Sequence, residues 1–502
     1  MNASLRLRSD ALWRITATVL SCVAILFICT QPLVSNDFWL QAKVGEIIVT
    51  HHHIPDTLLF PFTEASNQRF NAHEWLPSAV FYLLIHALGE PVMPLLLGFL
   101  GLLLFLLTAH IASRRAYANW ALGLCCGWIA MLVENYRHFL RPELIAIFFL
   151  LLFWYSLERF RHHPSIRWLI CALVLVILWV NSHGSFVLAP VIASAYAVGV
   201  AIDVRRRHLL LPANRGLAWN FVGITLASML CMLANPLGTE LLSFVFRFNH
   251  SSVSGQYIVE WFSSLDPRLV HTPALWLGGI TGLLALATGL VNRRKISAVD
   301  GLMVTIFVLL GVRAFRFLVY LGFATSFLLA CAWRDALKDA AHQRRLLQVS
   351  SLLSCLVLGF ASQFGNMNGN FPYRTDFAEV LTEPMKRTLA TAELRGNVYN
   401  SYDLGAELVY RAYPRLKPSI DSRIDSYGDD YFLYHEHLLS DAKEMDSFVE
   451  MYDVRYMLLT RDDFVTFQKQ GEWQTGRWSI LTLDRRAVLL QRNLPLKPDG
   501  SH

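Results

Sequence analysis

The stretch "WRITATVLSCVAILFICTQPLVSNDFW", residues 13–39, is almost wholly apolar for about twenty residues and then presents an acidic residue and a tryptophan. Arg6, Arg8 and Arg14 lie at or before its start. Its length suits a helix that crosses a membrane, and no small-residue cleavage pattern follows it. We therefore interpret the run as a signal anchor and not as a removable signal peptide. The polar residues after Val34 then lie at a membrane surface.

The composition of the whole chain is that of a polytopic membrane protein. Of its 502 residues, 54% are hydrophobic and only 16% are charged, whereas a soluble protein usually carries about 25% charged residues. The eight cysteines all fall in apolar segments without a CxxC pair, so neither a disulfide framework nor a cysteine metal site is expected. The net charge of +6 comes mostly from short loops between apolar runs and does not indicate nucleic-acid binding.

The apolar runs predict a polytopic α-helical membrane protein with about eleven transmembrane helices. The predicted spans cover residues 13–34, 91–112, 117–134, 143–157, 168–180, 185–203, 217–235, 273–291, 299–312, 317–333 and 347–364. With the N-terminus in the cytoplasm, every basic cluster between spans lies on the cytoplasmic side, as the positive-inside rule requires. Those cytoplasmic loops include Arg115 and Arg161.

Two segments outside the spans complete the predicted organisation. The membrane domain, residues 1–364, contains a first external loop at 35–90, in which 74–89 is too short for a span and suits an interfacial helix. The histidine triplet His51–His53 is interpreted as the end of a helix that begins near Phe38. From residue 365 the composition becomes polar, and 365–502 is expected to be a small extracytoplasmic α/β domain. It should contain a helix and a strand in 440–460 and two strands in 478–493.

Ionisable residues gather on the external face of this predicted topology. They are the carboxylates Asp37, Glu74, Glu143 and Glu260, the cations Arg137, Arg141, Arg313 and Arg316, and the histidines His73, His138 and His183. Such groups at the mouth of a helical bundle are costly to place and often functional. Arg313 and Arg316 are three residues apart, so we expect them on one helical face. Cations there require an acidic partner or a bound anion such as a lipid phosphate, and both interpretations stay open.

Three stretches together resemble the GT-C superfamily of integral-membrane glycosyltransferases. They are "NDFW" (36–39), "NAHEWLPSAVFYLLIHALG" (71–89) and "RPELIAIFFLLLFWYSLERFR" (141–161). The resemblance is to the lipid-A aminoarabinose transferases, the protein O-mannosyltransferases and uncharacterised bacterial relatives. In these proteins an acidic residue follows the first span and precedes a short interfacial helix. Gln41 departs from the pattern, since the bacterial relatives often carry histidine there, and Phe38 stands where some mannosyltransferases have a second acid.

The resemblance implies an enzyme of the bacterial cytoplasmic membrane. It would transfer a sugar, with inversion, from a polyprenyl-phosphate donor to an envelope acceptor (lipid, glycan or protein) on the outer face, among membrane lipids. Asp37 is the expected base and Glu74 a second catalytic residue, while Arg141, Arg313 and Arg316 are candidates for the phosphate. The full set of expected substrate-binding residues is Trp39, His73, Trp75, Arg137, Arg141, Glu143, His183, Arg313 and Arg316. No metal-ligand set is assigned, although a divalent cation bound by Asp37, His73 and Glu74 is left open.

Two other functions are compatible with a polytopic chain. A transporter or flippase would carry ionisable residues near the membrane midplane, often in repeated halves, whereas here the spans are apolar through their centres. A non-catalytic scaffold of envelope polysaccharide assembly would use the C-terminal domain for docking. In that domain Asp421, Arg423, Asp425 and Tyr427 alternate along a segment expected to be a strand, which would place them on one face. They could form a sugar- or protein-binding edge or a solvated structural network, and both interpretations stay open.

Overall fold

The computed structural model describes residues 3–31, 35–206, 215–248, 258–368, 381–469 and 476–493. The chain divides into two units. The helical unit comprises Met1–Gln31, Val92–Leu242 and Ser252–Arg374, and the loop–sheet unit comprises Pro32–Pro91, Ser243–Ser251 and Thr375–His502. Contacts thus group the predicted first external loop with the C-terminal segment. The boundary of independently folding domains at residues 364 and 365 stays a prediction.

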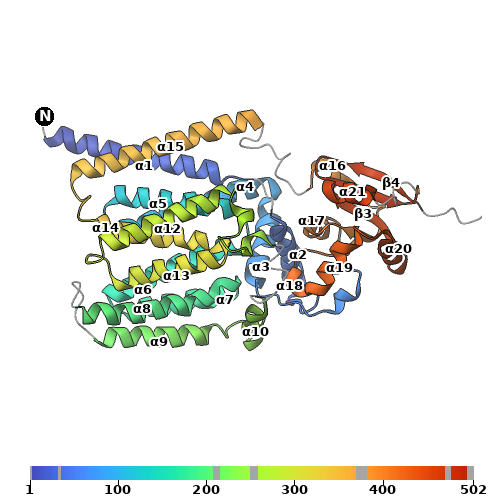
Figure 1. Ribbon diagram of the computed structural model, residues 1–502, viewed down its shortest axis with the longest axis horizontal. Coiled ribbons are helices and arrows are strands. Elements are labelled where there is room, and N and C mark those ends of the chain that lie inside the picture. The colour runs from blue at the N-terminus through green and yellow to red at the C-terminus, as the bar shows by residue number, and fades with distance from the viewer. Residues whose placement is uncertain are drawn as a thin grey trace, which may run out of the picture. The chain divides into compact units, whose positions relative to one another are not determined.

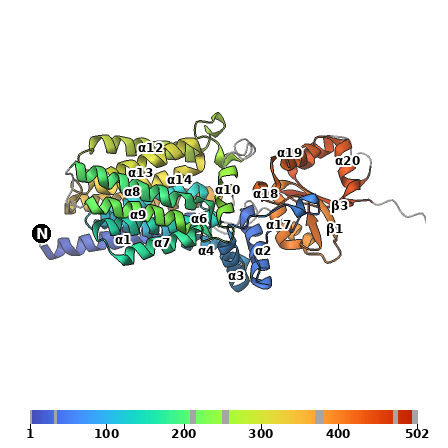
Figure 2. The same cartoon turned by 90° about the horizontal axis from the view of Figure 1, so that it is seen from below.

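A helix forms at each predicted span of the helical unit, and Figures 1 and 2 show these helices side by side. They are α1 (Ala3–Cys29), α4 (Met93–Arg115), α5 (Trp120–Glu134), α6 (Pro142–His162), α7 (Ile166–Val180), α8 (Leu188–Arg205), α9 (Arg215–Cys231), α12 (Pro273–Val291), α13 (Ala298–Arg313), α14 (Leu318–Trp333) and α15 (Ala340–Asn368). Five described segments are long and apolar enough to cross a membrane: Ser9–Cys29, Glu90–Arg115, Gly184–Arg205, Pro273–Val291 and Phe315–Trp333. The chain is therefore a multi-pass membrane protein, while the count of about eleven spans stays a prediction.

Helix α14 is the core of the helical unit. Nearly all of its side chains are buried, and it packs against α4, α5, α12 and α13. Small residues let neighbouring helices approach closely, as is usual where lipid supplies no hydrophobic drive between helices. A Cβ atom on Gly199 of α8 would lie 2.6 Å from a side-chain atom and 2.7 Å from the backbone of Val299 in α13. Only glycine fits this contact.

Buried ion pairs join the helix ends on the predicted cytoplasmic side. Arg115 in the last turn of α4 donates to Asp300 of α13 at 2.6 Å and lies 3.0 Å from Glu158 of α6. Arg161 in the last turn of α6 donates to Asp203 of α8 at 3.0 Å. The prediction that Arg115 and Arg161 lie in loops is therefore wrong. The helices continue into these residues because buried carboxylates balance their charges.

In the loop–sheet unit, α2 (Asn36–His51) packs against α3 (Trp75–Leu88). A Cβ atom on Gly45 would lie 1.9 Å from the carbonyl oxygen of Ser78, so this contact also requires glycine. Helix α2 ends at His51 because His52 is left-handed (φ 54°), which confirms the predicted helix end. The helix predicted at 74–89 is confirmed too, while its place on the membrane stays a prediction.

The remainder of this unit is a five-stranded sheet with helices on both faces. In chain order its elements are α16 (Glu383–Ala390), β1 (Gly396–Asn400), α17 (Tyr402–Ala412), β2 (Leu416–Pro418), α18 (Ile424–Tyr427), α19 (Asp429–Leu438), α20 (Ala442–Met451), β3 (Val454–Thr460), α21 (Arg461–Lys469), β4 (Trp478–Leu483) and β5 (Ala487–Arg492). The strand order is β2-β1-β3-β5-β4, with β1 parallel to β2 and β3, and β5 antiparallel to β3 and β4. The predicted helix–strand pair and two-strand turn are confirmed as α20–β3 and β4–β5.

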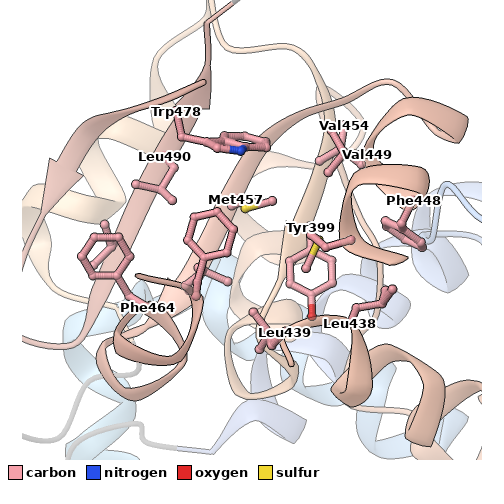
Figure 3. Close-up of a cluster of buried hydrophobic side chains, with 14 residues drawn as sticks. Tyr399, Leu438, Leu439, Phe448, Val449, Val454, Met457, Phe464, Trp478 and Leu490 are labelled. Atoms are coloured by element: carbon pink, nitrogen blue, oxygen red, sulfur yellow. The ribbon is translucent and has the colours of Figure 1, made fainter. Parts of the chain in front are cut away.

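Alternating side chains give the sheet two cores, because successive residues of a strand point to opposite faces. Tyr399, Met457 and Leu490 pack with α19, α20 and α21, and Figure 3 shows this cluster. The opposite core packs against α16 and α17. Phe62 of the first loop packs against the cluster of Figure 3, so the loop contributes to the core of the sheet.

The strand predicted across 421–427 is wrong. Asp421 accepts hydrogen bonds from the backbone N–H of Arg423 at 3.0 Å and from its side-chain Nε at 2.9 Å, and α18 follows. This local side-chain bond competes with a strand conformation. Arg423 is buried with its guanidinium 4.8 Å from the ring of Phe60 and 4.5 Å from that of Phe70. Arg423 therefore packs against the first loop, and Asp421 is buried beside it, so neither residue offers an open edge. The side chain of Asp425 lies outside the described residues.

Candidate active site

The acidic residues of the first loop lie at the starts of α2 and α3. Asp37 is half-buried in the first turn of α2. Gln41, one turn later, donates its Nε2 to Glu74 Oε2 at 2.6 Å, and the Ser78 hydroxyl donates to Gln41 Oε1. Glu74 is the residue that precedes α3, and Gln41 and Asp37 both lie on α2. These hydrogen bonds therefore hold the Glu74 carboxylate against α2.

His73, Trp39 and Trp75 lie close to these acids in the sequence and differ in exposure. Burial lowers the pKa of His73, although the bond between its Nδ1 and the carbonyl oxygen of Asn71 (3.0 Å) raises it. The imidazole is therefore neutral, with Nδ1 as the donor, and its Nε2 lies 3.8 Å from Glu74. Trp75 is half-buried. Trp39 is only 3% exposed, so it has little surface on which a sugar could stack.

A cationic cluster forms at one end of the helical unit, where several connections between helices meet. These connections are η3 (Asn135–Arg137), η4 (Gly184–Val187), η5 (Val259–Trp261) and η7 (Phe315–Phe317). Glu260 of η5 is the common acceptor: it binds Arg137, Arg316 at 3.3 Å and Arg141 at 3.4 Å. Three guanidinium groups from two connections between helices thus share one carboxylate.

Glu143 is the second acceptor of the cationic cluster. It lies in the first turn of α6, where the helix dipole favours a negative charge. Arg137 donates to its Oε2 from Nε at 3.2 Å and from Nη2, and Arg316 Nη2 lies 3.4 Å from its Oε1. Arg137 and Arg316 therefore each contact both carboxylates, which holds their planar groups in fixed orientations.

His183 adds a donor beside Arg316. Its Nδ1 accepts the backbone N–H of Ser185 at 3.1 Å, so the neutral ring carries its proton on Nε2. That Nε2 lies 3.5 Å from Arg316 Nη2. The guanidinium of Arg316 also lies 4.6 Å from the centre of the Trp261 ring, an arrangement that stabilises the cation.

The arginines of the cationic cluster keep its carboxylates ionised. Burial raises the pKa of Glu260, but the cations of Arg137, Arg316 and Arg141 outweigh it and lower that pKa to about 2. Arg137, Arg141 and Arg316 then face Glu143 and Glu260, three positive charges against two negative ones. Among these five residues the cations therefore outnumber the acids by one.

No protein-family model matches the chain, and no curated protein matches it. Among solved structures, the archaeal oligosaccharyltransferase AglB from Archaeoglobus fulgidus, in complex with an inhibitory peptide and a dolichol-phosphate, is similar with a TM-score of 0.56. The identity is 12%, over 89% of this chain and 69% of that chain. The enzyme tethered with an acceptor peptide gives 0.55 at the same identity and coverage. ArnT from Cupriavidus metallidurans gives 0.43 at 12% identity over 96% of this chain and 97% of that chain.

This chain has the GT-C fold. The resemblance found in the sequence is thereby confirmed at the level of the fold, by the oligosaccharyltransferase structures.

Of the six predicted substrate-binding residues in the helical unit, five lie together and one does not. Arg137, Arg141, Glu143, His183 and Arg316 form the cationic cluster with Glu260. Arg313 ends α13 and is exposed, and the extended backbone of Ala314 (φ −150°, ψ 132°) separates it from Arg316. The prediction of one shared helical face is wrong, and Arg316 has the acidic partners that the sequence left open.

Sequence reasoning assigned no role to Glu260, Trp261 or Gln41. Glu260 and Trp261 are adjacent in a short polar connection. An acidic residue beside an aromatic one was the sequence feature that could have indicated a functional position there. Gln41 was noted only as a departure from histidine, yet it links Glu74 to α2. The role of Glu260 depends on contacts with Arg137 and Arg316, which are 123 and 56 residues away in the chain. Such contacts have no local sequence pattern.

The sequence left open whether this chain binds a divalent cation. Within the described parts of the chain, the only three His, Cys, Asp or Glu side chains with ligand atoms within 4.8 Å of one another are His437, Asp441 and Glu444. Asp37, His73 and Glu74 do not converge in this way, and Glu74 is bonded to Gln41. A divalent cation bound by Asp37, His73 and Glu74 therefore stays a prediction.

Proposed function

We propose that the chain is a membrane glycosyltransferase that moves a sugar from a polyprenyl-phosphate donor to an envelope acceptor at the outer face of the bacterial cytoplasmic membrane. The observation that carries the proposal is the gathering of three arginines at the ends of the helices in a chain with the GT-C fold. The similar AglB structure contains a dolichol-phosphate and a peptide. A lipid phosphate and an acceptor are the corresponding ligand classes proposed for this chain.

The guanidinium groups of the cationic cluster suit the donor. A sugar linked to a lipid through a phosphodiester carries one negative charge, which an arginine can bind through two oxygens. Arg141 is the guanidinium best placed to turn toward a phosphate, because it is the most exposed of the three at 27% and makes the longest contact with Glu260, at 3.4 Å. The Nε2–H of His183 would donate a further hydrogen bond to a phosphate oxygen.

The same cations would favour the reaction as well as binding. The acceptor oxygen or nitrogen forms a bond to the anomeric carbon, and the bond from that carbon to the phosphate oxygen breaks, so the configuration inverts. The lipid phosphate leaves with the bonding electrons and gains a negative charge, which the guanidinium groups stabilise. The proton of the acceptor passes to Asp37 as general base, and Glu74 orients the acceptor.

The test compares lipid-linked sugars and envelope glycans by mass spectrometry in a strain that lacks the gene. The strain receives the intact gene, the Asp37→Asn variant or the control Asp56→Asn, which removes an exposed carboxylate of the same loop. We expect a missing sugar to be restored by the intact gene and by Asp56→Asn, and not by Asp37→Asn. Full restoration by Asp37→Asn would remove this residue from the chemistry and favour a transporter, flippase or scaffold.

A further inference from the structure

One arginine of the C-terminal sheet domain contacts both ends of the first loop. Arg411 lies near the end of α17, and its guanidinium is 4.7 Å from the centre of the Trp39 ring of α2. The neighbouring Tyr410 ring lies 4.9 Å from the same tryptophan. Trp39 is therefore buried between α2 and α17, two residues after Asp37. All these residues belong to the loop–sheet unit.

The other contacts of Arg411 reach the end of the loop. Its Nη1 and Nη2 donate to the two carboxylate oxygens of Glu90 at 3.1 and 3.0 Å. Its Nε donates to Glu407 at 2.6 Å, and Glu407 is itself buried and accepts the backbone N–H of Leu381 at 3.0 Å. The planar fork of arginine matches the Glu90 carboxylate while its face covers the indole, a combination that lysine cannot reproduce.

The Arg411 side chain joins more segments of the chain than an ordinary surface ion pair does. The guanidinium joins the start of the loop at Trp39, the end of the loop at Glu90 and the sheet domain at Glu407. Because the side chain of Arg411 is only 13% exposed, water competes weakly for these contacts. Loss of the guanidinium would release α2 from α17 at Trp39, two residues after the proposed base.

We propose that Arg411 is a positioning residue that holds α2, and with it Asp37, in place by bridging Trp39 and Glu90. The C-terminal domain would then act on the reaction through the first loop. The proposal rests on the proposed function for the role of Asp37, whereas the bridge itself does not depend on it.

The experiment measures hydrogen exchange of the full chain in detergent and sugar restoration in the deletion strain. The variants are Arg411→Gln and Arg411→Lys, with Arg415→Gln as the matched control. Arg415 also makes several hydrogen bonds in the same domain, to the carbonyl oxygens of Leu389, Leu394 and Thr391, but none of these partners belongs to the first loop.

We expect Arg411→Gln to raise exchange in peptides covering 36–51 about tenfold and to reduce sugar restoration, with Arg411→Lys between it and the wild type. Arg415→Gln should leave exchange in 36–51 unchanged. Unchanged exchange in Arg411→Gln, or raised exchange with full restoration, overturns the proposal. If Asp37→Asn also restores the sugar, the proposed function fails, and the exchange data alone then decide whether the bridge exists.

Discussion

Arg141 and Arg313 differ in the structure although the sequence treats them alike. Arg141 contacts Glu260 in the cationic cluster, whereas Arg313 is exposed at the end of α13. If the cationic cluster binds the lipid phosphate, Arg141→Gln should weaken binding of radiolabelled undecaprenyl phosphate to the purified protein by about tenfold, the usual effect of losing a charge-assisted hydrogen bond. Arg313→Gln serves as the control with the same chemical change.

Binding should remain at the wild-type value in Arg313→Gln. Equal loss in both variants would point to a general charge effect and not to a site at Glu260. Loss in Arg313→Gln alone would move the phosphate site to the end of α13, as the sequence first suggested.

Glu260 should make the stability of the protein sensitive to acid. Its pKa of about 2 lies below the ordinary value of 4.5, so the ionised form stabilises the folded state above pH 4.5. This contribution should be lost as the pH falls from 4.5 toward 2. Glu260→Gln should lower stability at pH 7 by about 3–5 kcal/mol, because Arg137, Arg141 and Arg316 then lose the carboxylate that they share. It should also flatten the loss of stability on acidification.

Thermal unfolding in detergent at several pH values measures both effects. Glu393→Gln is the control, because Glu393 is exposed. A Glu260→Gln variant with the acid dependence of the wild type would show that this carboxylate is not held by the arginines.

The charged residues of the candidate site could be picked out from the sequence, but their ion-pair partners could not be predicted. The external arginines and acids stood out because charged residues are rare in such an apolar chain. Which arginine finds a carboxylate depends on backbone details such as the extended Ala314, which turns Arg316 toward Glu143 and leaves Arg313 outside. Propensity and spacing do not encode that single dihedral change.

Helix packing in the membrane part depends on close approach at glycine. A methyl group on Gly199 would meet Val299 at 2.6–2.7 Å, so α8 and α13 must separate to admit it. We expect Gly199→Ala to lower the free energy of unfolding by about 1–3 kcal/mol, the usual cost of overpacking. Gly223→Ala on the neighbouring α9 is the control, because no atom lies within 4 Å of its added Cβ. Thermal unfolding in detergent compares the two; an equal effect would exclude a steric origin.

The elements were predictable where the local pattern and the tertiary contacts agree. The β4–β5 turn follows from alternating apolar residues on both sides of Asp484, whose side chain accepts the backbone N–H groups of Arg486 and Ala487. The prediction of a strand across 421–427 was wrong because Asp421 accepts a hydrogen bond from the backbone N–H of Arg423, which is incompatible with the alternation of a strand. The prediction that Arg115 and Arg161 lie in loops was wrong because buried acids from other helices stabilise them at the ends of α4 and α6, beyond the apolar runs.

At the scale of the whole molecule, the sequence could not show that the first loop belongs with the sheet. Phe62 donates its backbone N–H to the carbonyl oxygen of Pro418 at 3.1 Å, and Thr63 lies 3.2 Å from the hydroxyl of Tyr431, 368 residues along the chain. Contacts at such separations have no period and no motif. The grouping makes the C-terminal domain a structural support of the loop, which a scaffold function alone would not require.

Orientation in the membrane is the whole-molecule property on which the proposed chemistry depends. The basic loops predict that residues 56 and 393 lie outside the cell membrane and residue 165 lies in the cytoplasm. All three side chains are exposed. A membrane-impermeant maleimide applied to intact spheroplasts should therefore label Asp56→Cys and Glu393→Cys, and should label Ser165→Cys only after lysis. The unmodified chain is the control, because its eight cysteines lie in apolar runs.

The reverse labelling pattern would place Asp37 on the cytoplasmic side, where the proposed transfer to an envelope acceptor could not occur. Labelling of all three residues before lysis would instead show that the spheroplasts had leaked.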